Sequence, residues 1–427
     1  MDRNFSITEN HARERDEKDC LRSFRDRFYL LDNEIYMDGN SLGLMSKDAE
    51  RAVHRVMEEW KKLGINCWTK ASTPLFYYPE ELAKKMAPVV GAHGDEVIIH
   101  SSTTINIHSS IATFYHPTEK RYKIIVDELN FPTDRYAAES QIRLKGLNPD
   151  DCIVEIKSQD GRTIQENDVV AAMDDDVAIV FLPSVLYRSG QLLDMAFLTQ
   201  EAHRRGITIG FDLSHSAGAV PHELSKWGVD FAMWCNYKYL SSGPGATAGL
   251  YINRRHFNKT PGLAGWHGYV KEKQFDLLND FEAGQNAGGW QTGTTHVLSM
   301  APLEGSLAIF HEAGMSQLRE KSLHITAYLM YLIDEILTPY GFSVGNPRDD
   351  HRRGGHVALE HEEALRINEA LKDRGVLPDF RYPNVIRLAP VPLYVGYHDV
   401  WQVVQIIKQI MDERLYDNYG KERGIIA

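Results

Sequence analysis

The sequence predicts an α/β protein with a doubly wound, mainly parallel sheet and a smaller C-terminal domain. Short apolar runs alternate along the chain with segments of helical periodicity. Polar residues directly follow two of these runs, as they do at the carboxyl ends of buried parallel strands. The 427 residues are also long for one hydrophobic core. We therefore expect two domains and a ligand site outside the carboxyl ends of the strands.

The composition is that of an ordinary globular protein and argues against several classes. Hydrophobic residues make up 43% and charged residues 25% of the chain. The net charge of -12 argues against binding to nucleic acid or anionic membranes. The sequence has no apolar run of about 18 residues, the length needed to span a bilayer. The charged N-terminus is unlike a signal peptide, and the four cysteines form no C-x-x-C pair. We expect a cytoplasmic protein with reduced thiols.

The N-terminal third begins with helices and a turn. The sequence predicts a helix over residues 16–29, and then a turn-rich segment, DGNSLGLM, from Asp38. Ser46 is placed to cap a helix that runs to about Lys62. Four apolar residues recur on that segment at helical spacing: Ala49, Val53, Met57 and Trp60.

The middle of the chain supplies most of the predicted strands. They cover residues 96–100, 122–126, 152–156, 177–182, 207–211 and 229–235, with a helix over residues 194–205. A long helix from Leu303 through Ile336 then leads to the smaller domain, which begins near Tyr340. Strands in GGHVALEH and VIRLAPVPLY and a last helix over residues 398–412 complete it.

The segment from Ile207 to Gly249 contains the residues with the clearest chemistry. One predicted strand ends at Asp212, with His215 three residues later, and the next ends at Asn236, followed by Tyr237 and Lys238. Pyridoxal phosphate needs a lysine amine for its Schiff base and an acid that keeps its ring nitrogen protonated. Lys238 and Asp212 suit these two roles, and His215 could cover one face of the ring. The glycines of SSGPGATAG would let the backbone pass close to the cofactor.

A phosphate site is predicted at the start of the helix in SSTTINIHSS. Free backbone amides at a helix N-terminus bind phosphate, and Thr103 and Thr104 could add hydroxyl donors. The same residue types are also ordinary helix caps. The lysine motif downstream favours phosphate binding.

The motif D-x-x-H-x-x-G, followed by N-Y-K-Y-L-x-x-G-P-G, resembles the kynureninase family within the class V aminotransferase group. The likeness extends from Asp38 to Asp399. It implies the fold type I architecture of pyridoxal phosphate enzymes, with a seven-stranded sheet in the large domain. It further implies an N-terminal segment over residues 1–60 that packs on the small domain and the active site. A large cofactor-binding domain over residues 61–335 and a small domain over residues 336–427 would follow.

The resemblance also implies roles for individual residues. In the F-P-T-D motif, Phe131 would stack on the cofactor ring and Asp134 would lie beside it. Tyr237 would bind the phosphate and handle a proton. The remaining cofactor contacts implied by the match are Pro132, Thr133, Ser184, Trp266 and Thr294.

The matches to Trp266 and Thr294 reach the cofactor phosphate from the partner subunit in relatives, which implies an obligate homodimer. Arg387 matches the arginine that holds the substrate carboxylate, and a guanidinium suits a planar carboxylate. Ser41 and Asn66 are the other expected substrate contacts. The loop GINCW lacks the histidine of animal relatives, so we expect kynurenine to be preferred over 3-hydroxykynurenine.

The implied reaction is hydrolysis of L-kynurenine, or of its 3-hydroxy derivative, to anthranilate or 3-hydroxyanthranilate and L-alanine, in tryptophan degradation and NAD biosynthesis. Lys238 would remove the α proton and Asp212 would maintain the electron sink.

Two alternatives stay open. A cysteine desulfurase on the same fold needs a mobile-loop cysteine, and a regulatory protein would lack Lys238 or carry a DNA-binding segment; neither feature is present. No H-E-x-x-H motif occurs among the 18 histidines, so we expect no catalytic metal.

Overall fold

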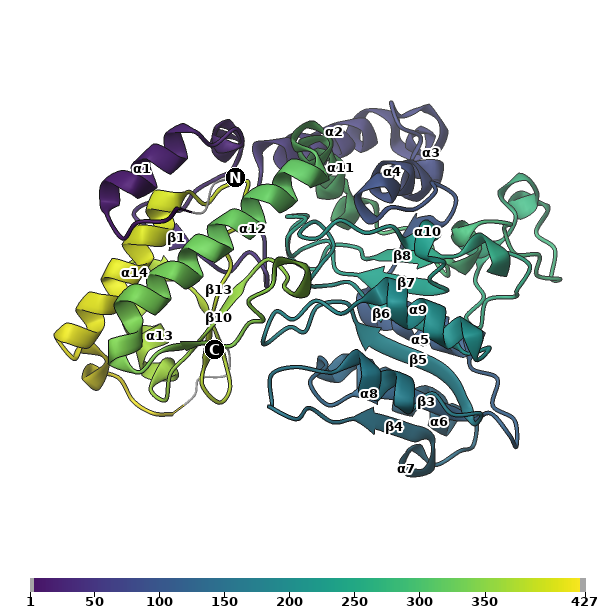
Figure 1. The fold of residues 1–427 in the computed structure, drawn as a ribbon. Coiled ribbons are helices and arrows are strands. Elements are labelled where there is room, and N and C mark those ends of the chain that lie inside the picture. Colours follow the sequence, from purple (N-terminus) through teal and green to yellow (C-terminus); the bar gives the residue numbers. More distant parts are fainter. Residues whose placement is uncertain (1–3, 423–427) are drawn as a thin grey trace.

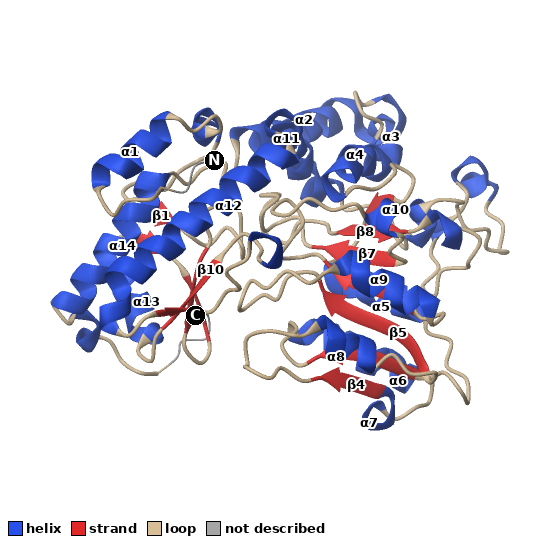
Figure 2. Cartoon of the chain, viewed as in Figure 1, coloured by secondary structure: helices blue, strands red, loops and turns tan. Residues whose placement is uncertain are grey.

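The computed structural model describes residues 4–422 and contains two main sheets that lie side by side (Figures 1 and 2). The larger sheet has seven strands in the order β2-β8-β7-β6-β5-β3-β4, and β8 alone runs antiparallel to its neighbours. The strands are β2 (Val97–Ile99), β3 (Lys123–Asp127), β4 (Ile153–Ile156), β5 (Val177–Pro183), β6 (Thr208–Asp212), β7 (Phe231–Trp234) and β8 (Gly249–Ile252). The predicted mainly parallel sheet is confirmed.

Helices cover both faces of this sheet, because successive side chains of each strand point to opposite sides. Ile179 and Phe181 of β5 pack in a cluster with residues of α5 (Thr103–Phe114) and α6 (Pro132–Leu144). Val180 and Leu182 belong to the other cluster, with residues of α9 (Met195–Arg204). The short helices α7 (Pro149–Cys152), α8 (Glu166–Ala171) and α10 (Leu224–Trp227) complete this part. The sheet is therefore doubly wound, as predicted.

The C-terminal part has an antiparallel sheet of four strands in the order β12-β13-β10-β9. Its strands are β9 (Ser343–Val344), β10 (Val357–Glu360), β12 (Asp379–Arg381) and β13 (Val385–Leu388), and its helices are α13 (Ala364–Lys372) and α14 (Tyr397–Asp412). A parallel pair, β1 (Ile35–Tyr36) with β11 (Val376–Leu377), joins the N-terminal segment to it. The next residues, from Asp38, enter the predicted turn beside Ala389. The chain thus passes from this strand pair directly into the site described below.

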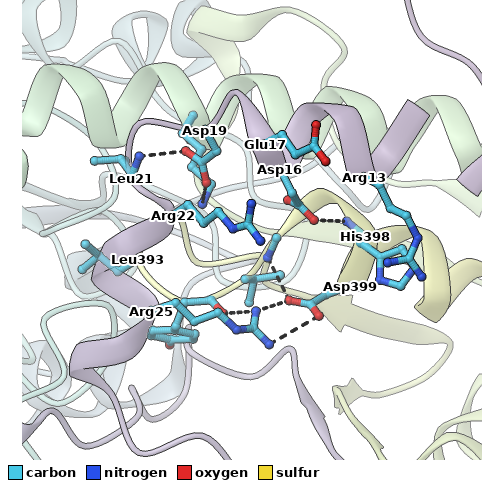
Figure 3. A pocket seen from close by; sticks show the side chains of 14 residues that line it. Arg13, Asp16, Glu17, Asp19, Leu21, Arg22, Arg25, Leu393, His398 and Asp399 are labelled. Carbon is cyan, nitrogen blue, oxygen red and sulfur yellow. Dashed lines mark hydrogen bonds and ion pairs between the residues drawn. The ribbon is translucent and has the colours of Figure 1, made fainter. Parts of the chain in front are cut away.

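The predicted helix over residues 16–29 is wrong in its bounds. Helix α1 covers Glu9–Glu17, and a separate 3₁₀ helix covers Arg22–Arg27. Asp16 and Asp19 break the helix because they bond elsewhere: the Asp16 carboxylate accepts hydrogen bonds from the backbone amides of Tyr397 and His398, and Asp19 accepts one from Leu21. Figure 3 shows this contact between the N-terminal segment and the start of α14. Asp16 thus stabilises a tertiary contact, and Asp19 also forms an ion pair with Lys321 instead of extending the helix.

Helix α2 (Lys47–Leu63) begins as predicted, because Ser46 Oγ accepts a hydrogen bond from the amide of Ala49 at 3.0 Å. Its buried face consists of Ala49, Ala52 and Val56, whereas Met57 and Trp60 are exposed. Two short helices follow, α3 (Cys67–Lys70) and α4 (Tyr78–Met86).

The single long helix predicted from Leu303 is in fact two helices. Helix α11 (Val297–Ala313) ends at Gly314, whose φ of 75° is unsuited to an α-helix, and α12 (Met315–Leu332) begins directly after it. Glycine takes this conformation without the steric cost that a side chain would add. Within residues 4–422, no helix has the length and apolarity needed to cross a membrane.

Candidate active site

A cavity of about 360 Å³ lies beyond the carboxyl ends of β6 and β7. Ten of the sequence-predicted residues line it: Ser41, Thr103, Thr104, Phe131, Thr133, Asp212, His215, Tyr237, Lys238 and Arg387. These residues come from six separate parts of the chain. The position follows from the sheet topology, since loops after parallel strands meet at one edge.

Lys238 and His215 face each other in this cavity. Lys238 Nζ lies 3.1 Å from His215 Nε2 and 6.0 Å from the centre of the Phe131 ring. Burial, and then the charge of Lys238, lower the pKa of His215 well below its usual value. The His215 Nδ1 atom is buried and has no hydrogen-bond partner. The histidine is therefore neutral at pH 7, and the amine lies between it and an aromatic face.

Asp212 is the last residue of β6 and is 7% exposed. Its Oδ1 accepts a hydrogen bond from the amide of Ser214 at 2.7 Å, which fixes the carboxyl at the start of the loop. Burial raises its pKa, while the charge of Lys238 opposes that shift. Asp134 lies beside it, fully buried, and both Asp134 carboxyl oxygens lack a partner. Burial, and then the charge of Asp212, raise the pKa of Asp134 well above its usual range.

The start of α5 forms another wall of the cavity. Ser102 caps this helix by accepting a hydrogen bond from the amide of Ile105, so its hydroxyl is used within the protein. Thr104 Oγ1 lies 2.8 Å from Thr133 Oγ1, and Thr103 Oγ1 lies 3.1 Å from Cys235 Sγ. The first-turn amides and these hydroxyls together are suited to an anion.

Arg387 comes from β13 of the small sheet and is 1% exposed. Its Nη2 forms an ion pair with Asp379 and donates to Ser41 Oγ at 2.9 Å, and its Nη1 donates to the carbonyl of Tyr187 at 2.8 Å. Burial lowers its pKa to about 10, which leaves the guanidinium charged at pH 7. A positive charge therefore faces the same cavity as the Lys238 amine.

Three predicted residues support the cavity without lining it. Pro132 is the first residue of α6, and Asp134 is the third residue of the same helix. Phe131 and Thr133, which line the cavity, are their neighbours in the chain. The amide and hydroxyl of Ser184 both donate to the carbonyl of Asp212, at 2.8 and 3.1 Å. Ser184 thus holds the end of β6 from behind.

Three other predicted residues lie away from this cavity within the chain. Asn66 is exposed at the end of a 3₁₀ turn, Trp266 is 44% exposed, and Thr294 is exposed before α11. The contacts assigned to Trp266 and Thr294 need a second subunit, and Asn66 does not line the cavity, so these roles stay predictions.

Sequence reasoning missed several residues of the site. Asn40, Tyr187, Ser214, Cys235 and Arg381 also line the cavity. Ser214 lies inside the motif and Cys235 directly precedes its second part, so both could have been found by their place after β6 and β7. Nothing in the local sequence of the other three distinguishes them from loop or strand residues.

The residues fit pyridoxal phosphate on structural grounds. The cavity holds an amine at Lys238, a buried carboxyl at Asp212 and the first turn of α5, which are the groups needed for the aldehyde, the ring nitrogen and the phosphate. The buried unpartnered Nδ1 atom of His215 is also explained by a bound polar ligand. Within the described residues 4–422, no three His, Cys, Asp or Glu side chains are grouped to hold a metal ion.

The fold is shared with solved pyridoxal phosphate enzymes. The cysteine desulfurase of Thermococcus onnurineus NA1 superposes with a TM-score of 0.78 at 16% identity, covering 92% of this chain and 98% of that one. A C-DES mutant with glycine covalently linked to its pyridoxal phosphate gives 0.75 at 14% identity, covering 90% of this chain and 98% of that one. The chain has the fold type I architecture of this class.

Sequence comparison then identifies the family. The model of the kynureninase C-terminal domain matches residues 318–407. Kynureninase of Geobacillus thermodenitrificans is 56% identical over 416 residues, covering 97% of each chain, and that of Bacillus anthracis is 54% identical over 423 residues, covering 99% of each. The kynureninase of Shouchella clausii is 50% identical over 98% of each chain. The chain belongs to the kynureninase family, whose enzymes depend on pyridoxal phosphate, and the desulfurase alternative is not favoured.

Proposed function

We propose that this protein hydrolyses L-kynurenine, and more slowly its 3-hydroxy derivative, to anthranilate or 3-hydroxyanthranilate and L-alanine. The observation that carries the proposal is the shared cavity of Lys238, Asp212 and Arg387. An amine, an acid and a buried cation are the groups that an α-amino acid and its cofactor require. Family membership supports the same substrate.

Bound pyridoxal phosphate would supply an electron sink for negative charge that develops at the α carbon. Lys238 would hold the cofactor and, once released by the substrate, remove the α proton. His215 stays neutral beside it because burial lowers its pKa, so it adds no second positive charge next to the amine. Asp212 would keep the ring nitrogen protonated from the buried end of β6.

Tyr237 is assigned to proton handling and to a phosphate contact. Burial raises its pKa above the usual value, so the phenol keeps its proton at pH 7 and acts as a donor. The side chain adjoins Lys238 in sequence and lines the same cavity. This placement supports delivery of a proton to the reacting part of the substrate.

Arg387 would bind the α-carboxylate, because it is a buried cation that lines this cavity. It belongs to β13 of the four-stranded sheet, whereas Lys238 follows a strand of the seven-stranded sheet. Ser41 adds a hydroxyl from the turn after β1. A substrate held at its carboxylate by Arg387 and at its amino group near Lys238 presents its α proton to the freed lysine.

The active protein would be a homodimer, with Trp266 and Thr294 serving the partner's cavity and Asn66 as a substrate contact. Support comes from an apolar groove of about 700 Å³ formed by α2, α3 and the residues before α11. It includes the exposed Trp60 and Ile65, and Thr294 lies in the same groove. The three-part domain division and the cytoplasmic location expected from the sequence are part of the same proposal.

Two measurements test the proposal. Purified protein loaded with pyridoxal phosphate should release anthranilate, detected by its fluorescence, and L-alanine in equal amounts from L-kynurenine. Borohydride reduction followed by peptide mapping should label Lys238, and Lys238→Ala should lose turnover. Absence of anthranilate, or a label on another lysine, would refute the assignment. Lys226→Ala, at an exposed lysine twelve positions earlier, is the matched control and should retain activity.

A further inference from the structure

Asp379 lies directly opposite Arg387 in the small sheet. Strands β12 and β13 are antiparallel neighbours, and their register pairs Asp379 with Arg387. Side chains of such a pair lie on the same face of the sheet. Asp379 is 3% exposed and forms an ion pair with Arg387 Nη2. The contact between these two charges therefore follows from the strand pairing itself.

Two further groups, Ser41 and Arg381, contact this ion pair. Ser41 Oγ donates to Asp379 Oδ2 at 3.1 Å and accepts from Arg387 Nη2 at 2.9 Å. Arg381 Nη2 lies 2.9 Å from the same Asp379 oxygen. Asp379 is thus shared by two arginines and by the turn that follows β1.

The hydrogen bonds of Arg387 are divided between the protein and the cavity. Both hydrogens of Nη2 are used by Asp379 and Ser41, and one hydrogen of Nη1 is used by the Tyr187 carbonyl. The Nε atom is buried and has no partner. The guanidinium keeps one Nη1 hydrogen and the Nε hydrogen for another acceptor.

We propose that Asp379 is a positioning residue, which fixes the guanidinium plane of Arg387 so that a hydrogen left free by the protein meets the α-carboxylate of an amino-acid substrate. The inference rests on the proposed role of Arg387 in the proposed function. Asp379 acts through Arg387 and does not touch the reacting atoms. A planar guanidinium binds a carboxylate well only in a narrow range of orientations. Asp379 is therefore a determinant of the preference for ligands that carry a carboxylate.

The test compares two ligands of the protein loaded with pyridoxal phosphate. L-Alanine and ethylamine share an amino group and a methyl group, but ethylamine lacks the carboxylate. Their dissociation constants are measured from the change in the cofactor absorbance spectrum. Asp379→Asn should raise the constant for L-alanine about tenfold, as expected for loss of one charge-assisted hydrogen bond. The constant for ethylamine should stay within about twofold.

Steady-state kinetics give a second readout. KM for L-kynurenine should rise about tenfold in Asp379→Asn, while kcat falls less. Asp379→Glu keeps the charge and should recover part of the L-alanine affinity. Glu360→Gln is the matched control, because Glu360 is a buried carboxylate on β10 of the same sheet that pairs with Arg162 and does not line the cavity. It should change neither dissociation constant.

Each other outcome overturns the inference. If Asp379→Asn weakens the binding of L-alanine and ethylamine equally, Asp379 has a general structural role. If neither dissociation constant changes, Asp379 has no role in binding. If L-alanine binds more tightly, Asp379 competes with the substrate for Arg387. If Asp379→Asn does not fold, Ser41→Ala removes a partner of the same guanidinium and must show a smaller selective loss. Wild-type protein that releases no anthranilate would refute the proposed function instead.

Discussion

Replacement of Asp212 by asparagine tests the electron sink of the proposed site. The substitution removes the carboxylate charge and keeps nearly the same shape. The asparagine oxygen can still accept the hydrogen bond that Ser214 donates to Asp212 at 2.7 Å, so the loop after β6 should keep its conformation. The perturbation is therefore mainly electrostatic.

The magnitude follows from the burial of this side chain. Asp212 is 7% exposed, so water screens its charge weakly. An opposite charge in close contact shifts a pKa by about 1–3 units, and two units correspond to about 2.7 kcal/mol. At tenfold in rate per 1.36 kcal/mol, loss of that stabilisation slows α-proton removal about a hundredfold. Cofactor binding should persist, because Lys238 and the α5 residues are unchanged.

The assay is exchange of the α proton of L-alanine in deuterated water, followed by NMR, with cofactor content measured by absorbance. Asp127→Asn is the matched control. Asp127 is also a buried aspartate at the end of a parallel strand, and its Oδ1 accepts from the amide two residues later, but it does not line the cavity. It should exchange within about threefold of wild type. A loss below about threefold in Asp212→Asn would refute the assigned role.

Three further predictions concern other parts of the molecule. Arg387→Leu should raise KM for L-kynurenine strongly and leave the cofactor spectrum intact; normal substrate binding would place the carboxylate elsewhere. Burial raises the pKa of Asp127 to about 7 from 3.8, so the folded state holds the proton more tightly and loses stability as the pH rises through this range. The Tm of Asp127→Asn should therefore exceed the wild-type Tm by more at pH 8 than at pH 5. An equal Tm difference at the two pH values would contradict the raised pKa of Asp127. Competitive turnover should favour kynurenine over 3-hydroxykynurenine, with Asn66→His shifting preference toward the latter; equal or reversed specificity constants in wild type would refute this prediction.

Much of the fold was predictable because local patterns determine it. The strands β3, β5, β6 and β7 are continuous apolar runs, as expected for strands buried on both faces. The two helix errors have different causes. Near the N-terminus a distant contact decided the structure, because Asp16 accepts hydrogen bonds from the amides of Tyr397 and His398. Between α11 and α12 a single backbone angle at Gly314 decided it.

The site was predictable where one motif contains it and unpredictable where packing assembles it. Asp212 and Lys238 follow adjacent strands, so topology alone brings them together. Tyr187 reaches the site through a backbone carbonyl, which no side-chain pattern could indicate. Asp379 depends on the register of β12 against β13 and looks in sequence like an ordinary polar residue near a strand end.

The structure also distinguishes two aspartates that sequence reasoning placed together beside the cofactor. Asp212 accepts a backbone hydrogen bond and faces the Lys238 amine, and both interactions favour its charged form. Asp134 has no such partner, and burial and the charge of Asp212 both disfavour ionisation. Burial raises the pKa of both carboxyls, and the rise is larger for Asp134, so the negative charge of the pair is favoured on Asp212. Because a carboxylate stabilises a protonated ring nitrogen, this asymmetry favours Asp212 over Asp134 for the electron-sink role of the proposed function.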